Sequence, residues 1–91
     1  MTLRDTLNER GERYRRFSDN ARTAQDIKFC FSESVNWDGT PTYMREALDV
    51  IASKIARILN GDPTYKDNWI DIMGYCQLVL DELNNETEGS K

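Results

Sequence analysis

The sequence predicts a small all-α protein, an antiparallel helical bundle of two long helices, one medium helix and one short helix. Three observations support this fold class. Apolar residues recur at a helical period in long stretches, and no stretch shows a convincing strand-like alternation. The chain has only 91 residues, so it buries roughly 60–65% of its unfolded surface and gains stability by pairing. We therefore expect a homo-oligomer.

Composition limits the classes of protein that remain. The hydrophobic fraction is 38% and the charged fraction is 31%, as in soluble globular domains. The longest apolar run is far shorter than the ~20 residues of a bilayer span. The N-terminus MTLRDTLNERGER carries acids and does not resemble a signal peptide. We expect one helical domain over residues 1–85, a polar disordered tail over residues 86–91, no membrane association and a cytoplasmic location.

Two helices are expected in the N-terminal third. The first spans about Leu3–Arg10 and stops at Gly11, and the linker GERYRRF follows. Ser18 or Asp19 then caps a second helix that ends near Glu33. The apolar face of this second helix comprises Ala21, Ala24, Ile27, Cys30 and Phe31.

A third helix is expected after the loop SVNWDGTP. Asp38 and Gly39 mark a turn in this loop. Thr40 is expected as the cap and Pro41 as the first helical residue, where the missing N–H of proline costs nothing. The helix runs to about Leu59. Its heptad-like apolar seam, which is expected to face the core, comprises Met44, Leu48, Ile51, Ile55 and Ile58.

The fourth helix is expected over about Lys66–Asn84. Asn60, Gly61 and Pro63 end the third helix before it. The short connection GDPTY makes the two long helices an antiparallel pair. The core stripe expected on the fourth helix comprises Trp69, Ile72, Met73, Cys76, Leu80 and Leu83.

The two cysteines are expected to be buried, reduced thiols. Cys30 and Cys76 lie far apart, each among apolar residues at helical spacing. The chain has no histidine and no CxxC motif. The usual nitrogen and sulfur ligands of zinc are therefore too few for a zinc site.

Two pairs of acids form a candidate metal site. Glu46 and Asp49 are one turn apart on the third helix, and Asp67 and Asp71 are one turn apart on the fourth. Carboxylates from two adjacent helices could hold Mg²⁺, which prefers oxygen ligands and bridges to phosphates. Gly74 would leave room beside Asp71 for a ligand or a second backbone. The alternative is that these acids belong to ordinary solvated helix faces and first turns.

Basic and aromatic residues form a candidate phosphate site. Residues 1–28 hold seven basic and five acidic side chains, whereas the whole chain has a net charge of −4. Arginine forks can bind phosphate while an aromatic ring stacks on a base. The candidates are Tyr14, Arg15, Arg16, Lys28, Lys54 and Arg57. The alternative is that Tyr14 and Phe17 anchor the linker while the arginines stay in water. Trp37 is expected to be a further anchor in its loop, or an exposed contact point if it packs on nothing.

The sequence also resembles known proteins. The stretch REALDVIASKIARILNGDPTYKDNWIDIMGY and the upstream pattern YxxFxDNAxxxQxIK resemble a group of small phage and prophage proteins over residues 12–83. This resemblance implies a phage context, and thus the host cytoplasm, without an established activity. A more distant likeness is to the MazG-type all-α nucleotide pyrophosphohydrolases. These are helical and usually oligomeric, and they bind Mg²⁺ through an ExxE pair and a later ExxD pair.

The MazG-type likeness implies the same acids as metal ligands. The first pair would be Glu46 and Asp49, as ExxD, and the second would be Asn68 and Asp71, as NxxD. One carboxylate is thus shortened and another is replaced by an amide, unless Asp67 substitutes. The likeness implies cleavage of nucleoside triphosphates to monophosphates and pyrophosphate.

Two functional hypotheses follow from the sequence. The first is a protein that binds a nucleotide or a related phosphorylated small molecule, either a Mg²⁺-dependent pyrophosphohydrolase or a degenerate relative without catalysis. The second is a non-catalytic phage protein that binds and inhibits a host protein, for which the aromatic and arginine side chains are suitable anchors. Direct DNA binding is not expected, because neither long helix is a basic recognition helix.

Overall fold

The computed structural model describes the backbone of residues 3–89 and the side chains of residues 16–86. Over the described backbone it contains three α-helices and no strand: α1 (Leu3–Ser32), α2 (Thr42–Asn60) and α3 (Lys66–Gly89). The all-α class is therefore confirmed. None of the helices in this described part has an apolar stretch long enough to cross a bilayer.

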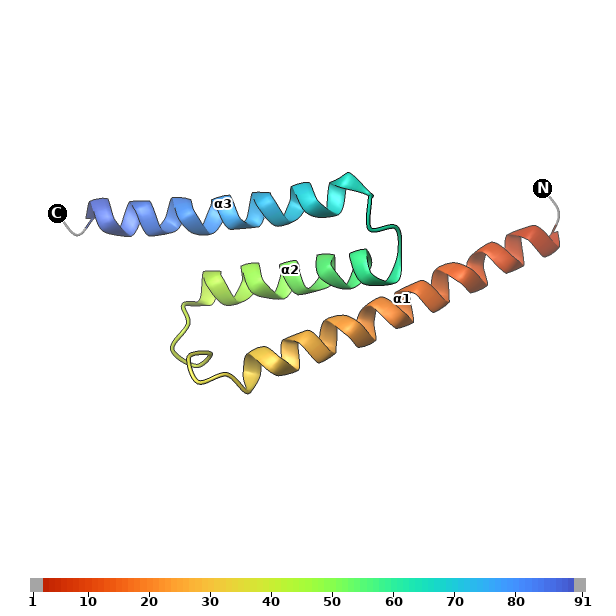
Figure 1. Cartoon of the computed structure of the whole chain (residues 1–91), viewed down its shortest axis with the longest axis horizontal. Helices are drawn as coiled ribbons and strands as arrows, with labels where there is room; N and C mark the ends of the chain where they lie inside the picture. The colour runs from red at the N-terminus through yellow and green to blue at the C-terminus, as the bar shows by residue number, and fades with distance from the viewer. Residues whose placement is uncertain (1–2, 90–91) are drawn as a thin grey trace.

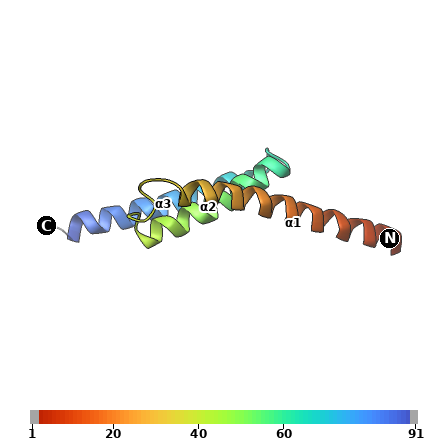
Figure 2. The ribbon, with the colours of Figure 1, turned by 90° about the horizontal axis from the view of Figure 1, so that it is seen from below.

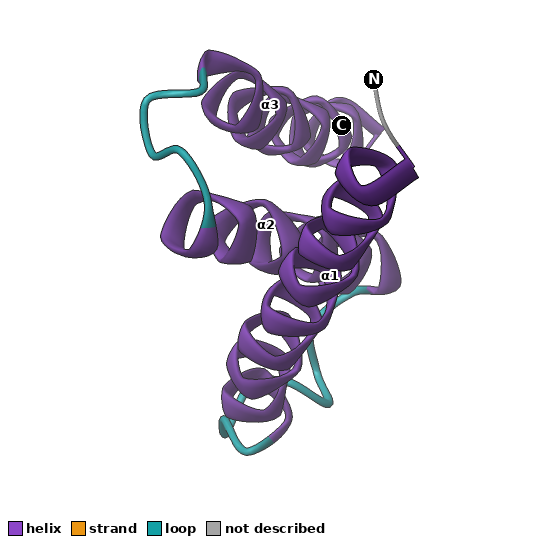
Figure 3. Ribbon diagram, turned by 90° about the vertical axis from the view of Figure 1, so that its right-hand side faces the viewer, coloured by secondary structure: helices purple, strands orange, loops and turns teal. Residues whose placement is uncertain are grey.

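The chain reverses direction at each of its two connections, so that α2 lies between α1 and α3 (Figure 1). The molecule is elongated, with extents of 64 × 27 × 19 Å. Helix α1 is the longest and continues beyond α2 and α3 towards the N-terminus (Figure 2). Viewed from the end, α1 slants across α2 (Figure 3). Within the described residues α2 contacts both of its neighbours, whereas α1 and α3 do not touch each other.

The expected break near the N-terminus is wrong, because α1 is continuous through Gly11 and the segment GERYRRF. A glycine inside a helix costs only about 1 kcal/mol relative to alanine. The rest of the segment contains strong helix formers and no proline, so nothing else interrupts the helix. Ser18 and Asp19, expected as caps, lie inside α1. The structure therefore has one long helix where the sequence predicted two.

The loop between α1 and α2 is held by local contacts. The ring of Trp37 stacks on Phe31 with centroids 5.4 Å apart, and the Arg45 guanidinium lies 5.9 Å from the Trp37 ring centroid. The anchoring role of Trp37 is thus confirmed. Thr40 is not the N-cap of α2, since its hydroxyl donates to the Asn36 carbonyl instead at 2.7 Å. Pro41 occupies the cap position without a side-chain hydrogen bond.

The helices pack through small side chains. The buried apolar residues of the described chain are Ala24, Ala47, Ala52, Ala56 and Ile58. Of the seam and stripe that were expected to form the core, only Ile58 is buried. Met44, Ile51, Ile55 and Ile72 are half-buried, and the other members are exposed. Alanine lets two helix backbones approach closely, and this close approach leaves the longer side chains beside the contact.

Both cysteine thiols are exposed, so the expectation that they would be buried is wrong. Cys76 belongs to the apolar stripe of α3. This stripe is mostly exposed because α3 turns a different side towards α2, the side on which the amide residue Asn68 is buried.

Candidate functional site

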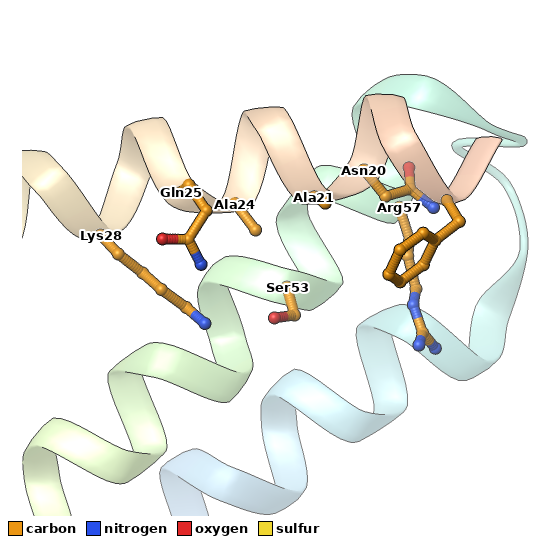
Figure 4. Close-up of a pocket in the computed structure, with 8 residues that line it drawn as sticks. Asn20, Ala21, Ala24, Gln25, Lys28, Ser53 and Arg57 are labelled. Atoms are coloured by element: carbon orange, nitrogen blue, oxygen red, sulfur yellow. The ribbon is translucent and has the colours of Figure 1, made fainter. Parts of the chain in front are cut away.

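A cavity of about 230 Å³ lies between α1 and α2 (Figure 4). We call it the cationic cavity. Its lining residues are Phe17, Asn20, Ala21, Ala24, Gln25, Lys28, Ser53 and Arg57. Six of them come from α1, at the spacing of three or four residues that places side chains on one face of a helix. The other two lie one turn apart on α2.

The packing of α1 against α2 fixes the two walls of the cavity. Ala24 on α1 is almost fully buried, and Ala52 and Ala56 on α2 are fully buried, so the helices meet closely beside the cavity. The Asn60 amide at the end of α2 donates to the Thr23 hydroxyl at 2.9 Å and to the Ala56 carbonyl at 3.0 Å. This side chain therefore ties the last turn of α2 to α1.

The cavity carries two positive charges and no acid among its lining residues. Lys28 and Arg57 approach from different helices, and they lie near opposite ends of the cavity with Ser53 between them (Figure 4). The chain as a whole has a net charge of −4. The cavity is therefore a locally cationic surface on an acidic protein, and a ligand that met both cations would have to extend along it.

The accessible ring of Phe17 favours a ligand with a flat part. Asn20 also lines the cavity, but its Oδ1 atom is closed to solvent, so that oxygen is out of reach of a ligand there. The Phe17 side chain lines the cavity while remaining 71% exposed, so its ring is accessible to a planar group.

The predicted phosphate-binding residues separate into three sets. Lys28 and Arg57 are brought together in the cationic cavity. Lys54 points elsewhere and forms an ion pair with α3, and Arg16 is exposed and does not line the cavity. Tyr14 and Arg15 lie on α1, but their side chains fall outside the described residues.

Ser53 is a lining residue that the sequence did not predict as a phosphate ligand. The available signal was its position one turn before Arg57, in the polar sector of the same helix. Ala21 and Ala24 were predicted only as apolar packing residues, whereas they also form a wall of the cavity.

The second predicted pair of acids already has partners in the chain. The Asp71 carboxylate lies 2.9 Å from Lys54 Nζ, with side-chain exposures of 45% and 17% respectively. The Tyr65 hydroxyl donates to Asp67 at 2.9 Å. This hydrogen bond, followed by the charge of Asp67, raises the pKa of Tyr65.

The first predicted pair lies further along α2. The Lys54–Asp71 ion pair fixes which residues of the two helices face each other. Because the helices run in opposite directions, Glu46 lies beside Val79, as the hollow that both residues line shows. Glu46 is eight residues before Lys54, which corresponds to roughly 12 Å along the helix axis. The two pairs are therefore offset by about two turns.

The offset bears on the predicted Mg²⁺ site. Among the residues that the structure describes, no three acid, cysteine or histidine side chains gather as metal ligands would. Magnesium needs its ligand oxygens at about 2.0–2.1 Å. Binding of one Mg²⁺ ion by Glu46, Asp49, Asp67 and Asp71 together is a prediction from the sequence that this arrangement does not confirm.

A second hollow, of about 440 Å³, lies between α2 and α3 around Glu46 and is acidic. Its lining includes Asp81 and Glu82 but no cation. Burial, followed by the charge of Glu86, a side-chain hydrogen bond with Glu86 and the charge of Glu82, raises the pKa of Tyr43, which also lines this hollow. This hollow therefore disfavours the anions that the cationic cavity favours.

Comparison of the chain with protein-family models, with curated proteins and with solved structures finds no match.

Proposed function

We propose that this protein binds a phosphorylated small molecule of the nucleotide type in the cationic cavity between α1 and α2. The observation that carries the proposal is that Lys28 and Arg57, on different helices, line one cavity with no acid among its lining residues. Lysine and arginine are the usual side-chain ligands of phosphate. The resemblance to MazG-type proteins, which act on nucleoside triphosphates, favours the same ligand class.

The size of the cavity suits part of a nucleotide. A volume of about 230 Å³ lies just below the roughly 300–1,000 Å³ of sites that enclose a drug-sized ligand. The phosphates would lie along the cavity between its two cations. The base would rest at the mouth against Phe17, whose ring is accessible there. Ser53 and Asn20 would contact the sugar or the phosphates from the walls.

We propose binding without turnover, which corresponds to a degenerate relative of the pyrophosphohydrolases. None of the four predicted metal ligands lines the cationic cavity. Asp71 is engaged by Lys54, and Asp67 by Tyr65. A ligand held in the cavity would therefore meet cations and amides of this chain, but not the carboxylates that the hydrolytic mechanism requires.

The test is a ligand screen with matched variants. The purified full chain is titrated with nucleoside triphosphates, cyclic dinucleotides and inorganic pyrophosphate, with and without Mg²⁺, using thermal shift and calorimetry. We expect Lys28→Ala and Arg57→Ala each to weaken binding about tenfold or more, since a charge-assisted hydrogen bond contributes roughly 1.5–3 kcal/mol. Arg22→Ala is the control, because Arg22 is exposed on α1 outside the cavity.

A second variant tests the position of the base. Phe17→Ala should weaken binding of nucleotides but leave the affinity for inorganic pyrophosphate unchanged, because pyrophosphate has no ring to stack. The proposal is wrong if no ligand in the panel binds, or if Arg22→Ala weakens binding as much as Arg57→Ala. Release of pyrophosphate during the titrations would contradict binding without turnover.

Binding to a host protein is the second candidate function, and the exposed apolar side chains favour it. Phe29 and Val35, near the connection of α1 to α2, are both exposed to solvent. In a pull-down from host extract with the tagged chain, a stoichiometric partner that is lost with Phe29→Ala and Val35→Ala would favour this function. An eluate that contains only this chain would count against it.

A further inference from the structure

An apolar face extends over α2 and α3 on the side away from the cationic cavity. It comprises Met44, Leu48 and Ile51 on α2 with Met73, Cys76 and Leu80 on α3. Five of these residues, with Ala47 and Val79, line a groove of about 400 Å³ whose lining is almost entirely apolar. On α2 the last residue of the face, Ile51, lies two residues before Ser53 of the cationic cavity, which corresponds to a turn of about 200° around the helix axis. The two sites therefore use opposite sides of α2.

The face is left uncovered by the rotation of α3. At 100° per residue, Met73, Cys76 and Leu80 lie about 80–140° around the helix axis from Asn68, which is buried. Met73 is 71% exposed and Leu80 is 52% exposed. Helix α3 thus contacts α2 through one side and presents its apolar stripe beside that contact.

The surface area of the chain indicates how much is uncovered. The accessible surface is 7238 Å², whereas a compact monomer of 10.6 kDa would expose roughly 5,500 Å². The radius of gyration is 17.3 Å, against about 12 Å for a compact domain of this length. Part of this surplus of roughly 1,800 Å² belongs to α1 where it extends beyond α2 and α3 (Figure 2), and the apolar face contributes another part. The whole surplus is comparable with the roughly 1,000–2,500 Å² that each protomer buries in an obligate homodimer.

We propose that a second copy of this chain covers the apolar face. Two copies related by a two-fold axis would place α2 and α3 of each protomer against those of its partner and close a four-helix core. None of the residues that define the face is charged, so two chains of net charge −4 could meet there without placing like charges in contact. A largely apolar interface is typical of permanent homodimers rather than of transient complexes.

A matched pair of substitutions on α3 tests the face. Leu80 and Leu78 are 52% and 58% exposed, but Leu78 lines the acidic hollow on the other side of the α2–α3 contact. We expect light scattering after gel filtration of the wild-type chain to give the mass of a dimer. Leu80→Lys should weaken association about 100-fold or more, because each dimer would bury two lysine charges. Leu78→Lys should change it less than about threefold, and circular dichroism should show helical protein in both variants.

Thiol reactivity provides a second measurement that does not depend on the lysine variants. In a Cys30→Ser background, the rate of Cys76 modification should fall as the protein concentration rises, because dimerisation buries Cys76. The same protein with Leu80→Lys should react at a rate independent of concentration. A wild-type chain that stays monomeric at about 100 μM, where a permanent homodimer would be assembled, would overturn the proposal. So would an oligomer that Leu80→Lys leaves intact, or one that Leu78→Lys disrupts equally.

Discussion

Replacing Ala52 with leucine should destabilise the protein, because α1 and α2 meet at this residue. Ala52 and Ala56 are fully inaccessible to solvent, so the three additional carbon atoms have no space. Overpacking of this kind costs about 1–3 kcal/mol. Leucine is nearly as good a helix former as alanine, so helix propensity contributes little of the loss. Taking about 2 kcal/mol, a chain of this length should lose about 8–16 °C in Tm.

The assay is thermal and urea unfolding followed by circular dichroism at 222 nm. All variants must be compared at one protein concentration, because association would make Tm depend on concentration. Ala21→Leu is the matched control. Ala21 lies on α1 of the same helix pair but lines the cationic cavity, so the larger side chain has room. We expect it to cost less than about 1 kcal/mol.

The comparison is decisive for the packing of α1 against α2. A Tm for Ala52→Leu within about 2 °C of the wild-type value would refute the close alanine contact, since a tightly packed site cannot absorb this volume without strain. Equal losses for Ala52→Leu and Ala21→Leu would show that the cavity beside Ala21 is not open.

Three further outcomes follow from single sites in α2, α3 and their connection. A Cβ placed on Gly74 meets no atom within 4 Å, so Gly74→Ala should raise stability in urea by about 0.5–1 kcal/mol, and a loss would show a close neighbour there. A double-mutant cycle with Lys54→Met and Asp71→Asn should give a coupling of only about 0.5–1 kcal/mol that shrinks in high salt, because Asp71 is 45% exposed. Hydrogen bonds from the hydroxyl and the backbone N–H of Thr64 lower the pKa of Asp62 below 3.8, so this carboxylate stabilises the fold above that pH and the contribution is lost as the pH falls through the lowered pKa. Asp62→Asn should therefore flatten the acid dependence of unfolding between about pH 2 and 5, and an unchanged profile would contradict the assignment.

The sequence predicted the second half of the fold well and the first half less well. Both ends of α2 and the start of α3 were predictable, because Pro41 and Pro63 fix φ and lack an N–H, and a Cβ on Gly61 would lie 2.9 Å from the Arg57 carbonyl oxygen. Gly11 imposes no such restriction. Its cost is smaller than the gain from a continuous run of helix formers, and only the balance between the two determines whether the helix breaks. The C-terminal end of α3 was not predicted: the helix was expected to stop near Asn84 but continues to Gly89.

The core was harder to predict than the helices, because periodicity identifies the apolar side of a helix but not the helix that packs against it. The spacing of Met73, Cys76 and Leu80 correctly indicated one apolar side of α3. It did not indicate that Ala47, Ala52 and Ala56 would make the closest contacts of α2. Each small side chain buries little apolar area, so a hydrophobic pattern gives it little weight. These side chains nevertheless set how closely two helices approach.

The candidate site was partly predictable for a related reason. Lys28 and Arg57 were identified by charge, but their meeting in one cavity depends on how α1 and α2 are aligned, which spacing within one helix does not specify. Lys54 carries the same charge and lies three residues before Arg57, yet it points to α3 and pairs with Asp71. A step of three residues leaves the two side chains about 60° apart around the helix axis. Which neighbouring helix each cation reaches therefore depends on where α1 and α3 lie around α2, and not on the spacing alone.

The absence of contact between α1 and α3 in the described part of the chain has a kinetic consequence. Every tertiary contact joins helices that are consecutive in the sequence, so no long loop must close before the chain can gain packing energy. Chains with such local topology fold in microseconds to milliseconds. The two hairpins share only α2, and hydrogen exchange should therefore resolve opening of α3 as an event separate from opening of α1.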